Sequence, residues 1–177
     1  MEENDVKISI GELRPALVWL FEYIPYLEDR VGGTFKFQYW DEETEELKDM
    51  EGYEESNRLA KFPDPVSYDE TWTELKHMLI RDVYEKFFVY CNPPKKYVGM
   101  KYSAWTEPED KLHWLLNNLL FAVFHERLCT GYTAVCMKDG TYLRILTRLK
   151  ELLAELPEDM VITCPLNEHG KRRMAKH

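Results

Sequence analysis

The sequence predicts a mainly α-helical domain, with four main helices and a small inserted β-hairpin; an α+β fold is the alternative. Four segments repeat apolar residues, mostly leucine, with the period of a helix. One segment between the first two of these alternates with the period of a strand. A Ser/Thr-x-x-Glu capping signature also precedes three of the helices. These signatures are Ser9 with Glu12, Ser67 with Glu70, and Thr106 with Glu109.

The length and composition predict one folded unit. The chain has 177 residues, of which 45% are hydrophobic and 14% aromatic, so it can bury a sizeable core. We expect a single globular domain over residues 1–165. Residues 166–177 are basic and are expected to form a flexible, solvated tail.

The first helix is expected from about residue 10 to residue 27. Pro15 and Pro25 disturb the pattern, and Pro25 is expected to end or kink the helix. Its apolar stripe is Leu13, Ala16, Leu17, Leu20, Phe21 and Ile24.

An alternating segment follows at residues 34–40 and predicts a strand. Residues 41–46 are too acidic for a core and predict an exposed hairpin loop. Residues 47–53 are the candidate return strand, and residues 53–62 are a candidate short helix.

The second helix is expected from about residue 68 to residue 90, where Asn92-Pro93-Pro94 ends it. Residues 96–105 are expected to form a loop or a poor strand. The apolar stripe of the second helix is Trp72, Leu75, Leu79, Val83 and Phe87.

The third helix is expected from about residue 107 to residue 128, with Gly131 as a left-handed stop. A short turn or helix covers residues 132–137. The fourth helix is expected from about residue 141 to residue 156 and is rich in leucine on one side.

The negative charge is concentrated in one window. Residues 41–70 contain twelve acidic and three basic residues and therefore carry the whole net charge of −9. Such a protein repels a phosphate backbone, so we expect no direct nucleic-acid binding. The same charge favours a basic protein partner.

The sequence predicts a cytoplasmic protein without a membrane span or a cofactor. Its four cysteines form no C-x-x-C pair and suit free thiols in a reducing compartment. The acidic start differs from a signal peptide, and the longest apolar runs are far too short to cross a bilayer. No nucleotide-binding glycine loop occurs, and the cysteines and histidines lack the spacing of metal ligands.

Charged residues gather where the third helix should end and the fourth should begin. Glu126 and Arg127 each follow a stripe leucine by seven residues, so both project near the buried face and need partners. One interpretation is a structural ion pair; the other is a polar pocket in which Arg127 holds an anion and Glu126 or His125 moves a proton. The candidate polar site comprises His125, Glu126, Arg127, Cys129, Asp139, Arg144 and Arg148.

Two pairs within this set have further interpretations. His125 and Cys129 lie four residues apart and supply at most half of a metal site or a thiol–imidazole pair. Arg144 and Arg148 also lie four apart, opposite the leucines, where a solvated face paired with Glu151 and Glu155 is expected.

The run from Phe124 to Leu149 resembles a family of uncharacterised microbial proteins, domain of unknown function 6508. The family pattern is close to R-x-E-R-F-x-x-G, then x-D-G, then L-x-x-L-x-R-L near the C-terminus. The strong match covers about residues 119–150, and His125 and Leu128 depart from the pattern. The matching residues are Glu126, Arg127, Gly131, Asp139, Gly140, Leu143, Leu146, Arg148 and Leu149.

The resemblance implies no catalytic residues. It implies a linked polar set in which Arg127 or Arg148 pairs with Glu126 or Asp139 and holds the third and fourth helices together.

Two functions follow as hypotheses. The preferred one is a non-catalytic binding or regulatory module that contacts a protein partner, through the acidic surface. The alternative is a small enzyme that acts on an anionic metabolite in an Arg/Glu/His pocket near residues 125–148. The composition is also compatible with a homodimer.

Overall fold

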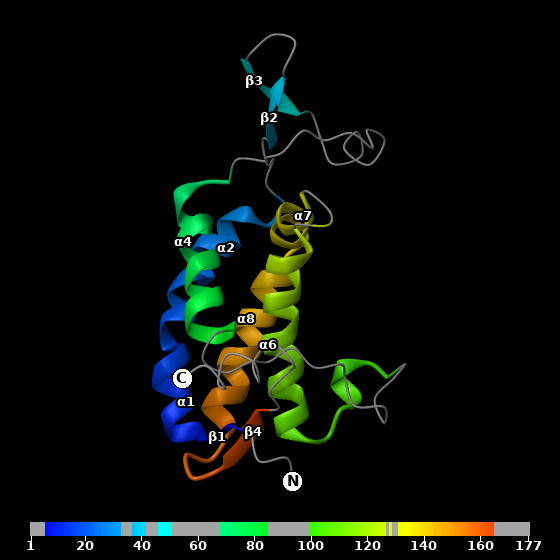
Figure 1. Ribbon diagram of the computed structural model, residues 1–177. Helices are drawn as coiled ribbons and strands as arrows, with labels where there is room; N and C mark the ends of the chain where they lie inside the picture. Colours follow the sequence, from blue (N-terminus) through cyan, green and yellow to red (C-terminus); the bar gives the residue numbers. More distant parts are fainter. Residues whose placement is uncertain are drawn as a thin grey trace.

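Leucine-rich helices packed side by side form the body of the protein (Figure 1). The computed structural model describes residues 6–32, 37–41, 46–50, 68–84, 100–126, 128 and 131–164. Within these residues the fold is mainly helical and contains two small antiparallel sheets. The expectation of a mainly α fold with a small hairpin is therefore confirmed.

The first helical run is divided by a 3-10 segment. Pro25 stands in the first turn of α2, and its ring nitrogen has no hydrogen to donate to Phe21 in the turn before. The expected disturbance at Pro25 is thus confirmed, although the run continues to Arg30. The elements are α1 (Ile10–Leu17), η1 (Val18–Tyr23) and α2 (Ile24–Arg30).

The expected capping box at the start of α1 is present. The Ser9 hydroxyl accepts from the Glu12 N–H at 3.3 Å, and the Glu12 carboxylate accepts from the Ser9 N–H at 3.0 Å. The backbone hydrogen bond from Ser9 is the main reason that the pKa of Glu12 is lowered.

The second helix begins with a different cap from the one expected. Asp69, rather than Ser67, is the N-cap, and its carboxylate accepts from the Trp72 N–H at 2.9 Å. Ser67 and the expected end of this helix at residues 85–90 lie outside the described residues. The helix consists of α4 (Glu70–Met78) and the π-helical turn η2 (Leu79–Tyr84), with Trp72, Leu75, Leu79 and Val83 buried as expected.

The third helix, α6 (Pro108–His125), lacks the capping box expected at Thr106. Its N-cap position is Glu107, which makes no side-chain cap. The carboxylate of Glu109 instead accepts a hydrogen bond from the Thr163 N–H of a distant strand. Glu109 therefore binds the backbone of a distant strand rather than the start of its own helix. The short helix η4 (Tyr102–Ala104) precedes α6, where a loop or poor strand was expected.

Two glycines with left-handed backbone mark the joins between the last three helices. Gly131 has φ 86° and opens α7 (Tyr132–Lys138), whereas α6 has already ended at His125. Gly140 has φ 76° and opens α8 (Thr141–Glu155). The expected helices over residues 132–137 and 141–156 are therefore confirmed.

The two sheets lie at opposite ends of the bundle in Figure 1. The expected hairpin consists of β2 (Phe37–Asp41) and β3 (Glu46–Met50), with Phe37 opposite Met50 and Asp41 opposite Glu46. At the other end β1 (Val6–Ser9) pairs with β4 (Val161–Cys164), a sheet that the sequence analysis did not predict. The expected hairpin loop, the expected helix at 53–62 and the basic tail at 166–177 fall outside the described residues, apart from the ends of the loop at Asp41 and Glu46.

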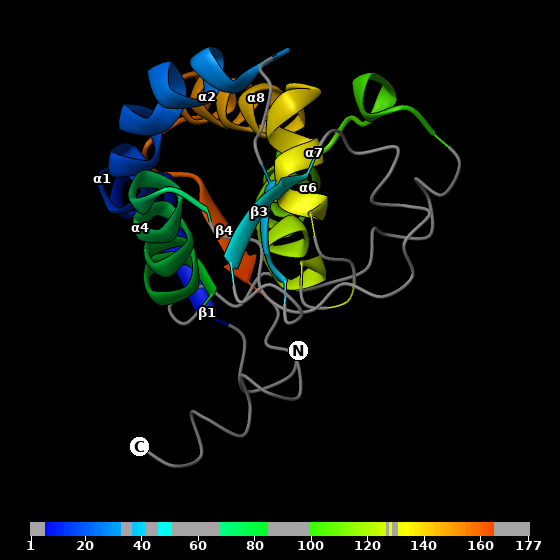
Figure 2. The same ribbon diagram turned by 90° about the horizontal axis from the view of Figure 1, so that it is seen from above.

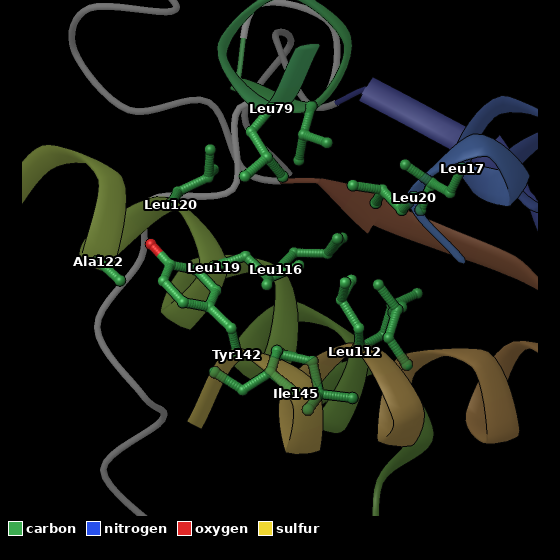
Figure 3. Packing of buried hydrophobic residues seen from close by; sticks show 14 of the residues in the cluster. Leu17, Leu20, Leu79, Leu112, Leu116, Leu119, Leu120, Ala122, Tyr142 and Ile145 are labelled. Atoms are coloured by element: carbon green, nitrogen blue, oxygen red, sulfur yellow. The ribbon is translucent and has the colours of Figure 1, made fainter. Parts of the chain in front are cut away.

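The core fills the space between α1, α4, α6 and α8. In Figure 3 Leu112, Leu116 and Leu119 of α6 face Tyr142 and Ile145 of α8. Full burial of each such aliphatic side chain contributes about 1.5–3 kcal/mol relative to exposure. The contact of α6 with α8 confirms that the two leucine-rich helices lie against each other.

Arg14 of α1 clamps the end of α8. Its Nε donates to the Leu153 carbonyl at 3.0 Å and its Nη2 to the Leu156 carbonyl at 2.9 Å. Its Nη1 pairs with Glu158 at 3.0 Å. These carbonyls lie at a helix C-terminus, where they have few intrahelical partners and attract positive charge. Arg14 thereby joins the first helix to the last.

Candidate functional site

Glu126, just after the end of α6, is held by three hydrogen-bond donors. The Tyr68 hydroxyl and the Gly131 N–H donate to its Oε1 at 2.6 and 2.8 Å, and the Thr133 N–H donates to its Oε2 at 2.8 Å. Each carboxylate oxygen therefore accepts at least one hydrogen bond from the protein. The two backbone donors belong to the first turn of α7, so Glu126 satisfies N–H groups that have no partner within the helix.

Tyr68 supplies the partner that the sequence analysis did not identify. Its ring is half-buried next to Trp72, at 6.1 Å between ring centroids. Burial, followed by the negative charge of Glu126, raises the pKa of the Tyr68 hydroxyl well above its ordinary value. This hydroxyl therefore keeps its proton and acts as a donor to Glu126.

The next residue, Asp69, ties the same end of α4 to α2. Its carboxylate accepts from the Tyr26 hydroxyl at 2.9 Å and pairs with Arg30 at 2.8 Å. The guanidinium of Arg30 also lies 4.8 Å from the centroid of the Tyr26 ring. Burial and the nearby Asp69 raise the pKa of Tyr26. Tyr68 thus attaches the start of α4 to the end of α6, and Asp69 attaches it to α2.

Asp139 and Arg144 stabilise the turn between α7 and α8. The Asp139 carboxylate accepts from the Thr141 N–H at 2.8 Å, as an aspartate in a turn commonly does with the N–H two residues on. Arg144 donates to the Asp139 carbonyl at 2.7 Å and to the Thr141 hydroxyl at 3.0 Å. Both side chains are exposed. They lie at the opposite end of α7 from the N–H groups that Glu126 binds.

Arg148 is not part of this cluster. It forms an exposed pair with Glu151 at 2.8 Å on the outer face of α8. The sequence analysis gave this solvated pairing as the plainer alternative, and it is confirmed. The pairing of Arg148 with Glu126 or Asp139 that the resemblance implies is wrong, because Glu126 is held by a hydroxyl and two backbone N–H groups instead.

His125 belongs to an aromatic patch, which we define as Phe121, His125 and Tyr132. The His125 ring stacks on Phe121 at 4.8 Å and meets Tyr132 edge-on at 4.6 Å. Phe121 is 38% exposed. Apolar groups that gather on a surface in this way are typical of a contact site.

Arg127 and Cys129 lie outside the described residues, so their partners stay predictions. Cys136 of α7 is buried close to the cluster. Burial raises the pKa of its thiol to about 11. A nucleophilic cysteine requires the opposite, a thiolate favoured at neutral pH. Cys136 is therefore a packing residue.

Tyr142 of α8 lies in the core beside this cluster. Its ring packs against Trp72 with 5.1 Å between ring centroids. The hydroxyl is buried near Thr133, but among the described residues it has no partner with the geometry of a hydrogen bond. Burial raises the pKa of Tyr142 well above its ordinary value.

The described part of the chain contains no cluster of three histidine, cysteine or acidic side chains that could hold a metal ion. None of its helices combines the length and the apolar character that a membrane crossing requires. No family model matches the chain, and no significantly similar curated protein or solved structure was found. The resemblance to domain of unknown function 6508 therefore stays a prediction.

Proposed function

We propose that this protein is a non-catalytic binding module that contacts a basic protein partner through its acidic segment. The observation that carries the proposal is that the Glu126 carboxylate binds groups of the protein itself. A general acid or base needs to lie within hydrogen-bond reach of a substrate, whereas all three hydrogen bonds described for Glu126 come from the protein itself and connect α4, α6 and α7.

The other described candidates support the same proposal. Asp139 and Arg144 bind backbone groups of one turn, and Arg148 pairs with Glu151. These interactions position helices. The enzyme alternative would then depend on His125, Arg127 and Cys129.

The charge distribution supports the choice of partner. The acidic window at residues 41–70 carries a net charge of −9, and the described strand ends Asp41 and Glu46 lie opposite each other in the hairpin. Like charges placed directly across a strand pair are unfavourable unless a cationic group approaches them. A basic partner supplies that group, and electrostatic attraction speeds its association. On the grounds of cysteine usage we place this interaction in the cytoplasm.

The experiment measures binding of a lysine-rich peptide to the full chain by fluorescence anisotropy at several salt concentrations. The test variant changes Glu42, Glu43, Glu45 and Glu46 to Gln. The matched control neutralises four acidic residues of the helices, which are Glu22, Glu28, Asp29 and Glu155, all exposed.

We expect the test variant to lose about tenfold in affinity and to show a weaker dependence on salt, with the control close to wild type. Equal losses in both variants would show that only the net charge matters and would contradict the proposal. Anionic metabolites are screened in parallel by thermal shift. A metabolite that raises the melting temperature of the wild type, but not of Glu126→Gln, would favour the enzyme alternative.

A further inference from the structure

Strand β4 is held in the fold along both of its edges. Its inner edge pairs with β1, where Lys7 lies opposite Thr163. Hydrogen-bonded and non-hydrogen-bonded pairs alternate along antiparallel strands, and the bond from the Ile10 N–H to the Met160 carbonyl shows which pairs are bonded. The Thr163 N–H therefore points away from β1 toward α6, where the Glu109 carboxylate accepts its hydrogen bond. Glu109 thus attaches the outer edge of β4 to α6.

This strand covers one end of the hydrophobic core. In Figure 2 β4 lies between α1 and α6, and it contacts α6. Ile162 of β4 is fully buried, as is Ile10 at the start of α1, whereas Val161 is 55% exposed. One face of the strand therefore packs on the core and the other faces solvent. Releasing the outer edge of β4 would loosen this cover.

A histidine lies one turn after Glu109 on α6. His113 is four residues further along, so the two side chains are neighbours on the helix surface. The Nε2 atom of His113 is buried and has no hydrogen-bond partner among the residues that the structure describes. Burial lowers the pKa of His113, and the negative charges of Glu109 and Asp110 oppose this effect. His113 is therefore neutral at neutral pH, with acidic groups within one helical turn.

The charges that act on His113 come from its own helix. In β4, residues 161–163 carry no ionisable side chain, and Lys7 of the paired strand is exposed. The charged side chains of α8 are exposed as well. In η2 the buried carboxylate of Asp82 pairs with Arg81 at 2.6 Å. A proton on His113 is therefore balanced by the acidic residues one turn earlier in α6.

We propose that His113 and Glu109 form a pH-dependent switch, which holds the outer edge of β4 while His113 is neutral and releases it when His113 is protonated. A neutral imidazole leaves the Glu109 carboxylate to the Thr163 N–H. A buried imidazolium needs a counter-charge, and its bond to a carboxylate is stronger than that of a neutral backbone N–H. Protonated His113 therefore draws Glu109 away from Thr163, while β4 keeps its pairing with β1.

The sign of the effect on stability follows from the burial of His113. Its pKa in the folded protein lies below the ordinary value of 6.5, so the unfolded chain binds this proton more readily. The contribution of His113 to stability is therefore complete above pH 6.5 and is lost as the pH falls through the lower pKa of the folded protein.

The test is a pH titration of the full chain followed by NMR, from about pH 8 to about pH 4.5. The His113 ring is assigned by comparison with His113→Gln, whose side chain does not titrate. We expect the ring to titrate below 6.5 and the Thr163 amide to shift with the same midpoint. Relative to an unstructured peptide at the same pH, exchange of the Thr163 amide should rise about tenfold across that midpoint. The Leu146 and Leu149 amides of α8 should not follow it.

Two further variants separate the acidic residues. Glu109→Gln keeps an oxygen for the Thr163 N–H but removes the charge that attracts the imidazolium, so the Thr163 amide should no longer follow the ring. Asp110→Asn is the matched control, because it removes the neighbouring charge on the same helix, and it should preserve the coupling between His113 and Thr163.

Three results would overturn the proposal. The first is a Thr163 amide that shifts equally in wild type and His113→Gln, because the carboxylate alone would then control the strand. The second is a His113 ring that titrates without any change at Thr163, or that stays neutral down to about pH 5. The third is equal acceleration of exchange at Thr163, Leu146 and Leu149, which would show that acid destabilises the whole protein.

Discussion

Replacing Arg14 with Met should weaken the whole fold, because Arg14 clamps α1 to the end of α8. Its hydrogen bonds to the carbonyls of Leu153 and Leu156 are partly buried, and each is worth about 1 kcal/mol net. The pairing with Glu158 adds little, since the Glu158 side chain is 79% exposed. Met keeps the apolar stem, so the expected loss in the free energy of unfolding is about 2 kcal/mol.

Urea unfolding followed by circular dichroism measures this loss directly. For a chain of 177 residues, about 2 kcal/mol corresponds to a fall of roughly 4–8 °C in the melting temperature. The matched control, Glu158→Gln, removes only the exposed pairing and should cost at most about 0.5 kcal/mol. A control that loses as much stability as Arg14→Met would refute the reasoning, since the carbonyl contacts would then contribute nothing.

Three further predictions concern the core and the turns. Tyr142→Phe should unfold at the same or a higher urea concentration than wild type, because a buried hydroxyl without a hydrogen-bond partner costs about 1–3 kcal/mol. Cys136 should react about a hundredfold more slowly with iodoacetamide at about pH 8 in the folded protein than in the unfolded one, as mass spectrometry of its peptide would show. Its pKa is raised from 9.0 to about 11 on folding. The folded state therefore holds the proton more tightly, and stability should fall as the pH rises from 9.0 to about 11, less steeply in Cys136→Ala. Gly140→Ala should cost more stability than Gly32→Ala, although both have positive φ, because only at Gly140 would the new Cβ meet neighbours, with Arg144 Nη1 at 3.3 Å.

The helices were predictable because each buries one face in a shared core. Leu112, Leu116 and Leu119 recur at helical spacing, and that spacing decides which side of α6 is buried. The Ser9–Glu12 cap was predictable for a different reason, since it depends only on neighbours in sequence. The Thr106–Glu109 signature did not predict the cap correctly, because Glu109 accepts a hydrogen bond from the Thr163 N–H. No local pattern could reveal that distant partner.

The sheet of β1 and β4 was missed because its two short strands come from opposite ends of the chain. Each has four residues, too few for an alternating pattern to stand out.

The candidate site shows a similar division. The periodicity of α6 placed Glu126 near the buried face and required a partner for it, which is what the structure shows. The described partners of Glu126 are a tyrosine hydroxyl and two backbone N–H groups, whereas the expected pairing with the Arg127 guanidinium stays a prediction. Tyr68 is 58 residues away from Glu126, so helical spacing could not identify it. The signal that the sequence offered was a tyrosine next to an expected helix start.

The central claim is that Glu126 stabilises the fold by accepting a hydrogen bond from the Tyr68 hydroxyl. A double-mutant cycle tests this claim most directly. The free energy of unfolding is measured for wild type, Tyr68→Phe, Glu126→Gln and the double variant. The hydrogen bond at 2.6 Å predicts a coupling free energy of about 1–2 kcal/mol between the two side chains. A coupling within about 0.3 kcal/mol of zero would contradict the claim, because the two residues would then act independently.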